Sequence, residues 1–155
     1  MPGLPIIFKL NVGYPGLQDE REIVRRRSGQ FEINKVLTKE DIFTARQLVD
    51  QVYVDEKVTD YILRIVFATR HPKEYGVNAE NLIMYGASPR ASIGLTIAAK
   101  AHAFLHGRAF VTPHDIKQLA HDVLRHRIRR TYEAEAEEVS PDIIIDRILE
   151  TIPVP

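Results

Sequence analysis

Three Ser-Pro or Thr-Pro pairs fix where helices start in the second half of the chain. The pairs are Ser88-Pro89, Thr112-Pro113 and Ser140-Pro141, and each precedes an apolar run with helical spacing. A hydroxyl side chain can cap a free backbone N–H, and proline at the first helical position lacks an N–H that would otherwise be unpaired. The first predicted helix, residues 90–106, is apolar almost all round and is therefore expected to be central and buried. Gly107 is expected to end it as the C′ residue.

Two further helices are predicted upstream of these pairs. Thr38, with Asp41 three residues later, resembles a capping box, and apolar residues recur at helical spacing after it. Asp55 is expected to cap the next helix, which Pro72 would stop. The segment 73–87 then reads as a loop, and a loop that long inside a compact domain is often functional.

The first thirty residues have a different pattern. Residues 6–12 (IIFKLNV) are rich in β-branched and apolar side chains and precede the turn signal GYPG, which predicts a strand. Leu17 to Arg27 predicts a helix, with acidic residues early and arginines late. A lone strand is unstable, and the alternating segment Phe31-Glu32-Ile33 is too short to be a clear partner. We therefore expect the strand to pair with a second copy or to be poorly ordered. The predicted fold is mainly α, a helical bundle preceded by a strand–helix piece.

Composition excludes several classes of protein. The chain has 155 residues, no cysteine, and 21 Lys and Arg against 21 Asp and Glu. The lack of cysteine rules out a disulfide scaffold, a thiolate zinc site and a cysteine nucleophile. The net charge of zero argues against a generally basic nucleic-acid binder. No apolar run reaches the roughly 18 residues of a membrane span and no signal peptide is evident, which predicts a cytoplasmic location.

The strongest chemical signal is Arg90, which follows Ser88-Pro89 in the first turn of the predicted central helix. The helix dipole disfavours a cation at this end, whereas the free N–H groups there attract anions. An arginine beside such N–H groups is a good phosphate clamp. The alternatives from spacing alone are a solvated surface arginine or one paired with a nearby carboxylate.

Two other patterns resemble known sites but lack essential parts. Val52 to Glu56 (VYVDE) mimics a Walker B motif, yet no P-loop pattern occurs in the chain, and Asp55 is better explained as a helix cap. His102 and His106 lie at i and i+4 on one helix face, a spacing that can bind a metal, but Ala103 stands where HExxH has glutamate. We expect packed or interfacial histidines and no metal site; a helical metal protein is the less favoured reading.

The run Arg125 to Arg130 (RHRIRR) offers an alternative function, a stand-alone helical protein-interaction or DNA-binding module. Four glutamates follow it between residues 133 and 138, which weakens the nucleic-acid interpretation. Complementary charge at a helix C-terminus and a contact between subunits are the competing explanations.

Several segments together resemble the C-terminal part of MoxR-type AAA+ ATPases, relatives of the magnesium chelatase ATPase subunit. The most specific is residues 86–91 (GASPRA), followed at family-like spacing by Gly107-Arg108 and Val111-Thr112-Pro113. The resemblance also rests on residues 8–10 with 13–15, 61–70 (YILRIVFATR), 98–101, 115–116 and 123–127 (VLRHR). It covers nearly the whole chain from about residue 7.

The resemblance implies a division of the chain and a role for Arg90. Residues 1–30 would be a remnant of the nucleotide-binding core, its last strand and helix, and residues 31–155 the helical lid. Arg90 would be the catalytic sensor 2 arginine at the terminal phosphates of ATP, and Ser88 and Pro89 would aim it. The parent would be a ring-forming remodelling chaperone that uses ATP and Mg²⁺. Its partners would be the rest of the core, neighbouring subunits and protein clients, including proteins with von Willebrand A domains.

Some family elements are missing from the chain. The P-loop, Walker B and sensor 1 precede this region in the family, and the usual Asp-Arg-Phe before the strand is replaced by Leu4-Pro5-Ile6. The start at Met1 is therefore expected to be a truncation or a mis-assigned start. The chain alone is expected to be inactive as an ATP hydrolase and to carry no bound ATP or Mg²⁺.

Overall fold

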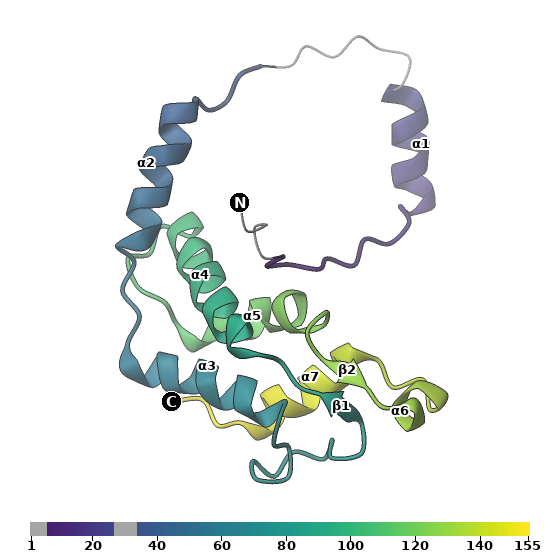
Figure 1. The fold of residues 1–155 in the computed structure, drawn as a ribbon. Helices are drawn as coiled ribbons and strands as arrows, with labels where there is room; N and C mark the ends of the chain where they lie inside the picture. The colour runs from purple at the N-terminus through teal and green to yellow at the C-terminus, as the bar shows by residue number, and fades with distance from the viewer. Residues whose placement is uncertain (1–5, 27–33) are drawn as a thin grey trace, which may run out of the picture.

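A computed structural model describes residues 6–26 and 34–155 of the chain (Figure 1). The predictions for Arg27 and for Phe31-Glu32-Ile33 lie outside these residues, as does most of Leu4-Pro5-Ile6. The described part is mainly helical, as predicted, and none of its helices is long and apolar enough to cross a membrane. Its elements in chain order are α1 (Leu17–Arg26), α2 (Lys39–Asp50), α3 (Glu56–Ala68), β1 (Ile83–Tyr85), α4 (Pro89–Leu105), α5 (Pro113–Leu124), β2 (Arg129–Arg130), α6 (Tyr132–Ala136) and α7 (Pro141–Thr151).

The core lies where α4 crosses α5 and where α3 and α7 pack beside this pair (Figure 1). Small residues on α4 allow the close approach, and Gly94, Ala98 and Ala99 are all buried. The prediction that this helix is central is confirmed. Its burial is one-sided, however, because Ile93 and Ile97 remain 59% and 48% exposed. The largest fully buried side chains of the core are Tyr61, Ile62, Ile65, Leu95, Ile116, Leu124, Ile144, Ile145 and Ile148.

Most of the predicted helix ends are confirmed. Thr38 and Asp41 form the capping box of α2, and the Asp55 carboxylate accepts a hydrogen bond of 2.8 Å from the Lys57 N–H at the start of α3. Gly107 follows α4 with a φ of +68°, the left-handed conformation that glycine adopts without strain. Ser88 is the exception, because its hydroxyl makes no capping hydrogen bond to α4.

The segment predicted as a long loop contains a short strand. β1 pairs antiparallel with β2, with Ile83 opposite Arg130 and Tyr85 opposite Arg129. The Thr131 N–H extends the contact by donating to the Leu82 carbonyl at 3.1 Å. Three-residue strands carry little periodicity, so this pairing has no clear signal in the sequence.

The prediction of a strand over residues 6–12 is wrong, because the segment forms no regular secondary structure and no strand pair. A strand forms only against a neighbour that completes its hydrogen bonds. Here the Lys9 N–H donates to the Asp122 carbonyl at 2.8 Å, and the Arg125 guanidinium donates to the Lys9 carbonyl. The segment therefore lies along the end of α5, a contact that the sequence did not predict. Pairing with a second copy stays a prediction.

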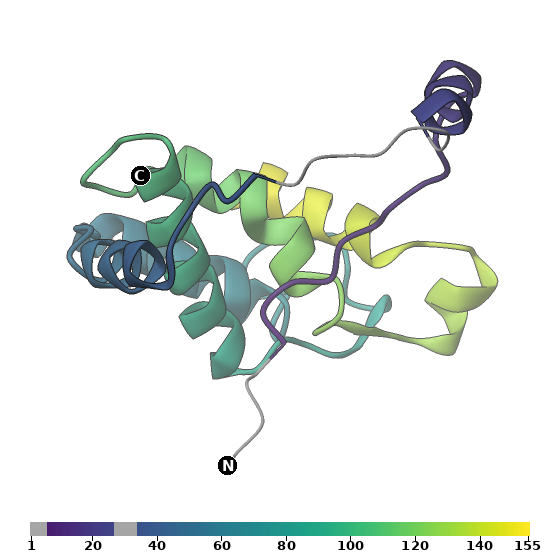
Figure 2. The same ribbon diagram turned by 90° about the horizontal axis from the view of Figure 1, so that it is seen from above.

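The predicted helix after this segment is confirmed as α1. None of its residues is buried, and in Figures 1 and 2 it lies away from the other helices. Its first turn carries Asp19 and Glu20 and its last turn Arg25 and Arg26, the charge order that complements the helix dipole. Local charge therefore favours this helix, and none of its residues is buried against the other helices.

Candidate functional site

The segment that leads into α4 is fixed against the end of α3. A Cβ atom on Gly86 would lie 2.3 Å from the backbone oxygen of Thr69, so glycine is required at this close approach. The Ala87 N–H donates to the Thr69 hydroxyl at 2.8 Å, and that hydroxyl donates to the Val66 carbonyl at 2.6 Å. Thr69 and Ala87 are both fully buried. The GASPRA motif therefore begins with a rigid anchor, which sets the position of Arg90 three residues later.

Arg90 lies exposed in the first turn of α4. Within residues 6–26 and 34–155 its guanidinium has no hydrogen-bond or ion-pair partner. The alternative of a carboxylate-paired arginine is therefore not favoured. A cation at this end of a helix opposes the dipole, so the placement costs free energy unless an anion is bound.

Arg90 borders a groove of about 210 Å³ between α4, the turn after α5 and the N-terminal segment. Residues 90, 93, 94 and 97 of α4 share one face of the helix, at i, i+3, i+4 and i+7. Ile7 and Arg127 complete the lining from the other side. The groove thus combines an apolar wall with two guanidinium groups, and none of its described lining residues is acidic.

Arg127 is partly buried beside this groove. Its Nε donates to the Val123 carbonyl at 2.9 Å and its Nη2 to the Ile6 carbonyl at 2.5 Å. Burial, and then the charge of Arg90, lower the pKa of Arg127 from its ordinary value. The positive charge of this guanidinium is therefore met by neutral carbonyl oxygens rather than by a carboxylate.

The structure places the three sequence-predicted site residues at one helix start. Pro89 occupies the first position of α4, and Ser88 precedes it without a side-chain cap. The start is fixed instead by the anchor at Gly86 and by the Ala91 N–H, which donates to the Ser88 carbonyl at 2.8 Å. The position of Arg127 at this groove was not predicted, because its sequence signals were membership of a basic run and of a family-like segment, and neither indicates a contact with α4.

The basic run is largely engaged within the chain. Arg125 bonds to Asp122 at 2.6 Å and to Asp142 at 3.0 Å. Arg130 donates to the Val139 carbonyl at 2.8 Å, whereas Arg129 is exposed. Because Arg125 and Arg130 are engaged in this way, the run does not present the row of free guanidinium groups that binding to DNA phosphates needs, and the geometry does not favour the DNA-binding alternative.

His102 and His106 belong to a polar cluster whose centre is Asp115. The buried Asp115 carboxylate accepts two hydrogen bonds from Arg108, at 2.8 and 2.5 Å, and contacts His102 Nδ1 at 2.6 Å. It also accepts from the N–H and hydroxyl of Thr112, both at 2.8 Å. Burial alone would raise the pKa of Asp115, but the hydrogen bonds from Arg108, Thr112 and His102 hold it well below its usual range.

The cluster around Asp115 gives the two histidines a structural role, and it does the same for Arg108 and Thr112 of the family-like segments. His106 Nδ1 contacts the His102 carbonyl at 2.8 Å, and the two rings lie tilted by 38° at a centroid distance of 4.2 Å. In the described residues no group of three or more potential metal ligands comes together. Arg108 and Asp115, both in the sequence motif, connect the end of α4 to the start of α5.

The segment that resembles Walker B, residues 52–56, makes contacts that support the fold. Val52 is buried, and the Tyr53 N–H donates to the Ala109 carbonyl at 2.9 Å. Asp55 caps α3, as predicted. The Asp55 side chain is therefore used at a helix start, which is the explanation that the sequence favoured for it.

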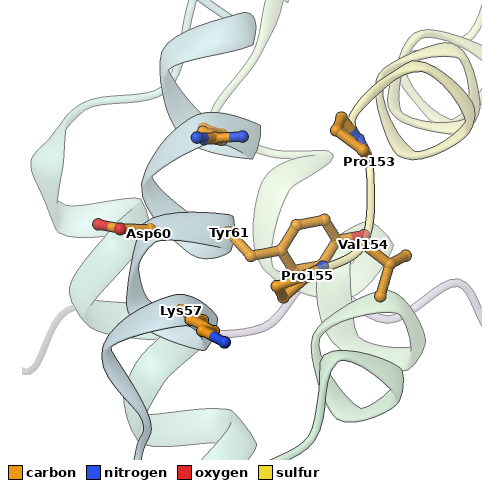
Figure 3. Close-up of a pocket in the computed structure, with 7 residues that line it drawn as sticks. Lys57, Asp60, Tyr61, Pro153, Val154 and Pro155 are labelled. Atoms are coloured by element: carbon orange, nitrogen blue, oxygen red, sulfur yellow. The ribbon is translucent and has the colours of Figure 1, made fainter.

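A second hollow, of about 160 Å³, lies between α3 and the C-terminal residues 153–155. Figure 3 shows the Tyr61 ring directed from α3 towards Val154 and Pro155. Tyr61 is 1% exposed, and its buried hydroxyl has no hydrogen-bond partner among the described residues. Burial raises the pKa of this phenol. Lys57, Asp60 and Arg64 border the opening with charges of both signs, so the hollow favours neither an anion nor a cation.

Comparison with known proteins shows which family the chain resembles. Residues 77–148, from the loop before β1 to α7, match the family model described as the AAA lid domain. The chain is 40% identical over 151 residues to the chaperone MoxR1 of Mycobacterium tuberculosis, covering 96% of this chain and 40% of that protein. It is 27% identical over 136 residues to a magnesium-chelatase subunit ChlI homolog of Methanocaldococcus jannaschii, covering 79% of this chain and 33% of that protein.

A solved structure shows the same fold. It is the crystal structure of a "putative ATPase" from Cytophaga hutchinsonii, 41% identical, with a TM-score of 0.92 over 96% of this chain. The chain belongs to the MoxR-type AAA+ ATPase family. It spans 46% of the Cytophaga chain and 40% of the Mycobacterium chaperone, and its residues 77–148 correspond to the AAA lid domain.

Proposed function

We propose that this chain serves as the lid of an ATP-driven MoxR-type remodelling chaperone, with Arg90 as the sensor 2 arginine. The observation that carries the proposal is the unpaired Arg90 guanidinium at the rigidly anchored start of α4. From this position it would stabilise charge on the transferring phosphoryl group and link the lid's position to the nucleotide state. Ser88 and Pro89 would set the direction of that first turn.

The rest of the nucleotide site would come from outside this chain. We propose that residues 1–30 belong to the nucleotide-binding core and residues 31–155 to the lid, which is consistent with the absence of buried residues in α1. Because the described residues bring together no cluster of metal ligands, Mg²⁺ would be held by the core. The parent protein is proposed to form homo-oligomeric rings in the cytoplasm and to act on protein clients, those with von Willebrand A domains among them.

The test is an arginine substitution in a protein that joins this chain to its nucleotide-binding core. Arg90→Ala is expected to lower ATP turnover by about 10²–10³-fold, the cost of removing one donor aimed at developing charge. Because Arg90 makes no contact that supports the fold, the unfolding midpoint should stay within about 1 °C. Steady-state ATPase assays and thermal unfolding measure the two outcomes.

The matched control is Arg129→Ala, which removes an exposed arginine of β2 that does not line the groove beside Arg90. Its turnover should equal that of the unmodified protein. Normal turnover in the Arg90→Ala protein would refute the phosphate role. Equal losses in both variants would attribute the effect to net charge rather than to the position of Arg90.

A further inference from the structure

Arg127 and Arg90 line the same groove, although Arg90 lies in the first turn of α4 and Arg127 in the turn that follows α5. Gly94 lies one turn after Arg90 on the same face of α4, and a Cβ atom there would lie 3.7 Å from Arg127 Nη2. The Arg127 guanidinium therefore rests against the α4 backbone one turn below Arg90. Two cations meet here at a helix N-terminus, and neither has a carboxylate partner in residues 6–26 or 34–155.

The hydrogen bonds of Arg127 leave part of its guanidinium available. Nε and Nη2 donate to the carbonyls of Val123 and Ile6, and Nη1 has no partner within the described ranges. A guanidinium is a planar fork whose donors point in fixed directions. It can therefore keep its two carbonyl contacts and still offer Nη1 to a further acceptor.

Arg127 is also connected to the N-terminal segment. Its Nη2 holds the Ile6 carbonyl, while the Lys9 N–H donates to the Asp122 carbonyl at 2.8 Å one turn earlier on α5. Ile7, between these two contacts, lines the groove itself. The groove thus has one wall on α4 and another on a segment that Arg127 holds in place.

We propose that Arg127 is a second phosphate-binding residue, which couples an anion bound at Arg90 to the position of residues 6–9. An anion between the two guanidinium groups removes their mutual repulsion and accepts a hydrogen bond from Arg127 Nη1. The guanidinium is then fixed more firmly on the Ile6 carbonyl. Binding of phosphate is thereby transmitted to a segment that precedes the lid. This inference rests on the phosphate role proposed for Arg90.

The experiment compares Arg127→Gln, Arg127→Lys and the control Arg129→Gln in the protein that joins this chain to its core. Affinity for a non-hydrolysable ATP analogue is measured by calorimetry, and hydrogen exchange of the Lys9 amide is measured with and without that analogue. In the unmodified protein the analogue should slow this exchange. Arg127→Gln should weaken binding about tenfold, the effect of losing one charged hydrogen bond, and abolish the slowing.

Arg127→Lys should recover most of the affinity but not the slowing, because an ammonium cannot hold the Ile6 carbonyl and the phosphate in one fixed fork. Arg129→Gln should behave as the unmodified protein. Unchanged affinity and slowing in Arg127→Gln, with a defective Arg90→Ala, would overturn this inference and leave the proposed function standing. A change in Lys9 exchange that is equal with and without the analogue would also overturn it, since a purely structural role has that effect. A fully active Arg90→Ala would instead refute the function itself.

Discussion

Arg90 and Arg108 stand at opposite ends of α4, and their surroundings differ completely. Arg108 lies just past the C-terminus, where the dipole favours a cation, and donates twice to the buried Asp115 carboxylate. Arg90 lies at the N-terminus, where the dipole disfavours a cation, and has no partner in the part of the chain that the structure describes. The comparison separates an arginine whose charge is satisfied by the fold from one whose charge is available to a ligand.

The largest expected effect on the free energy of unfolding concerns the C-terminal end of α4, where Arg108 is paired with Asp115. Asp115→Asn removes the charge that Arg108, His102 and Thr112 converge upon, and should lower the free energy of unfolding by about 3 kcal/mol, as expected for breaking a buried ion pair. Urea denaturation of the two proteins at pH 7 measures the difference. The control Asp146→Asn, whose side chain is 58% exposed, should cost less than about 1 kcal/mol.

The same substitution should change how stability depends on pH. The pKa of Asp115 is lower in the folded protein than in the unfolded chain, so its contribution is complete above about pH 4 and is lost as the pH falls further. Acid unfolding of Asp115→Asn should therefore be less steep than that of the unmodified protein. If the stability of both proteins fell equally steeply below about pH 4, protonation of Asp115 would not be what destabilises the protein in acid.

A smaller effect is expected where the fold positions Arg90. Gly86→Ala puts a Cβ atom 2.3 Å from the Thr69 backbone oxygen, which must force the backbone apart. We expect a loss of about 2 kcal/mol in the free energy of unfolding, typical of overpacking a close contact. Gly13→Ala is the control, because a Cβ there meets nothing within 4 Å and should leave stability unchanged. Equal unfolding midpoints for both variants would contradict the anchor.

The smallest effect concerns Arg90 itself. Arg90→Gln removes a cation from the first turn of α4, and should raise the free energy of unfolding by about 0.3 kcal/mol at low salt. The gain should vanish at high salt, because the charge is exposed and screened. Urea denaturation at two salt concentrations measures it. A loss of stability at low salt would mean that Arg90 has a structural role resembling that of Arg108, and the comparison would fail.

Local signals in the sequence were sufficient for most helices. Thr38 with Asp41, Asp55, Pro89 and Gly107 act within one turn of their own positions, so their roles could be predicted from spacing. The position of Arg90 at a helix start was predicted in the same way. The strand over residues 6–12 was predicted wrongly, because β propensity has no effect without a partner strand, and the end of α5 takes up its hydrogen bonds.

Contacts between residues far apart in the sequence were decided only by tertiary packing. Arg127 lies 37 positions after Arg90 in the numbering, and only the crossing of α4 and α5 brings both to one groove. Gly86 requires contact with Thr69, 17 positions earlier, and no local pattern encodes that approach. The sequence by itself determined the helices, their ends and the placement of a cation at one of them. The tertiary structure decided which arginines are neutralised, because charge pairing depends on distances of a few ångströms between separate elements.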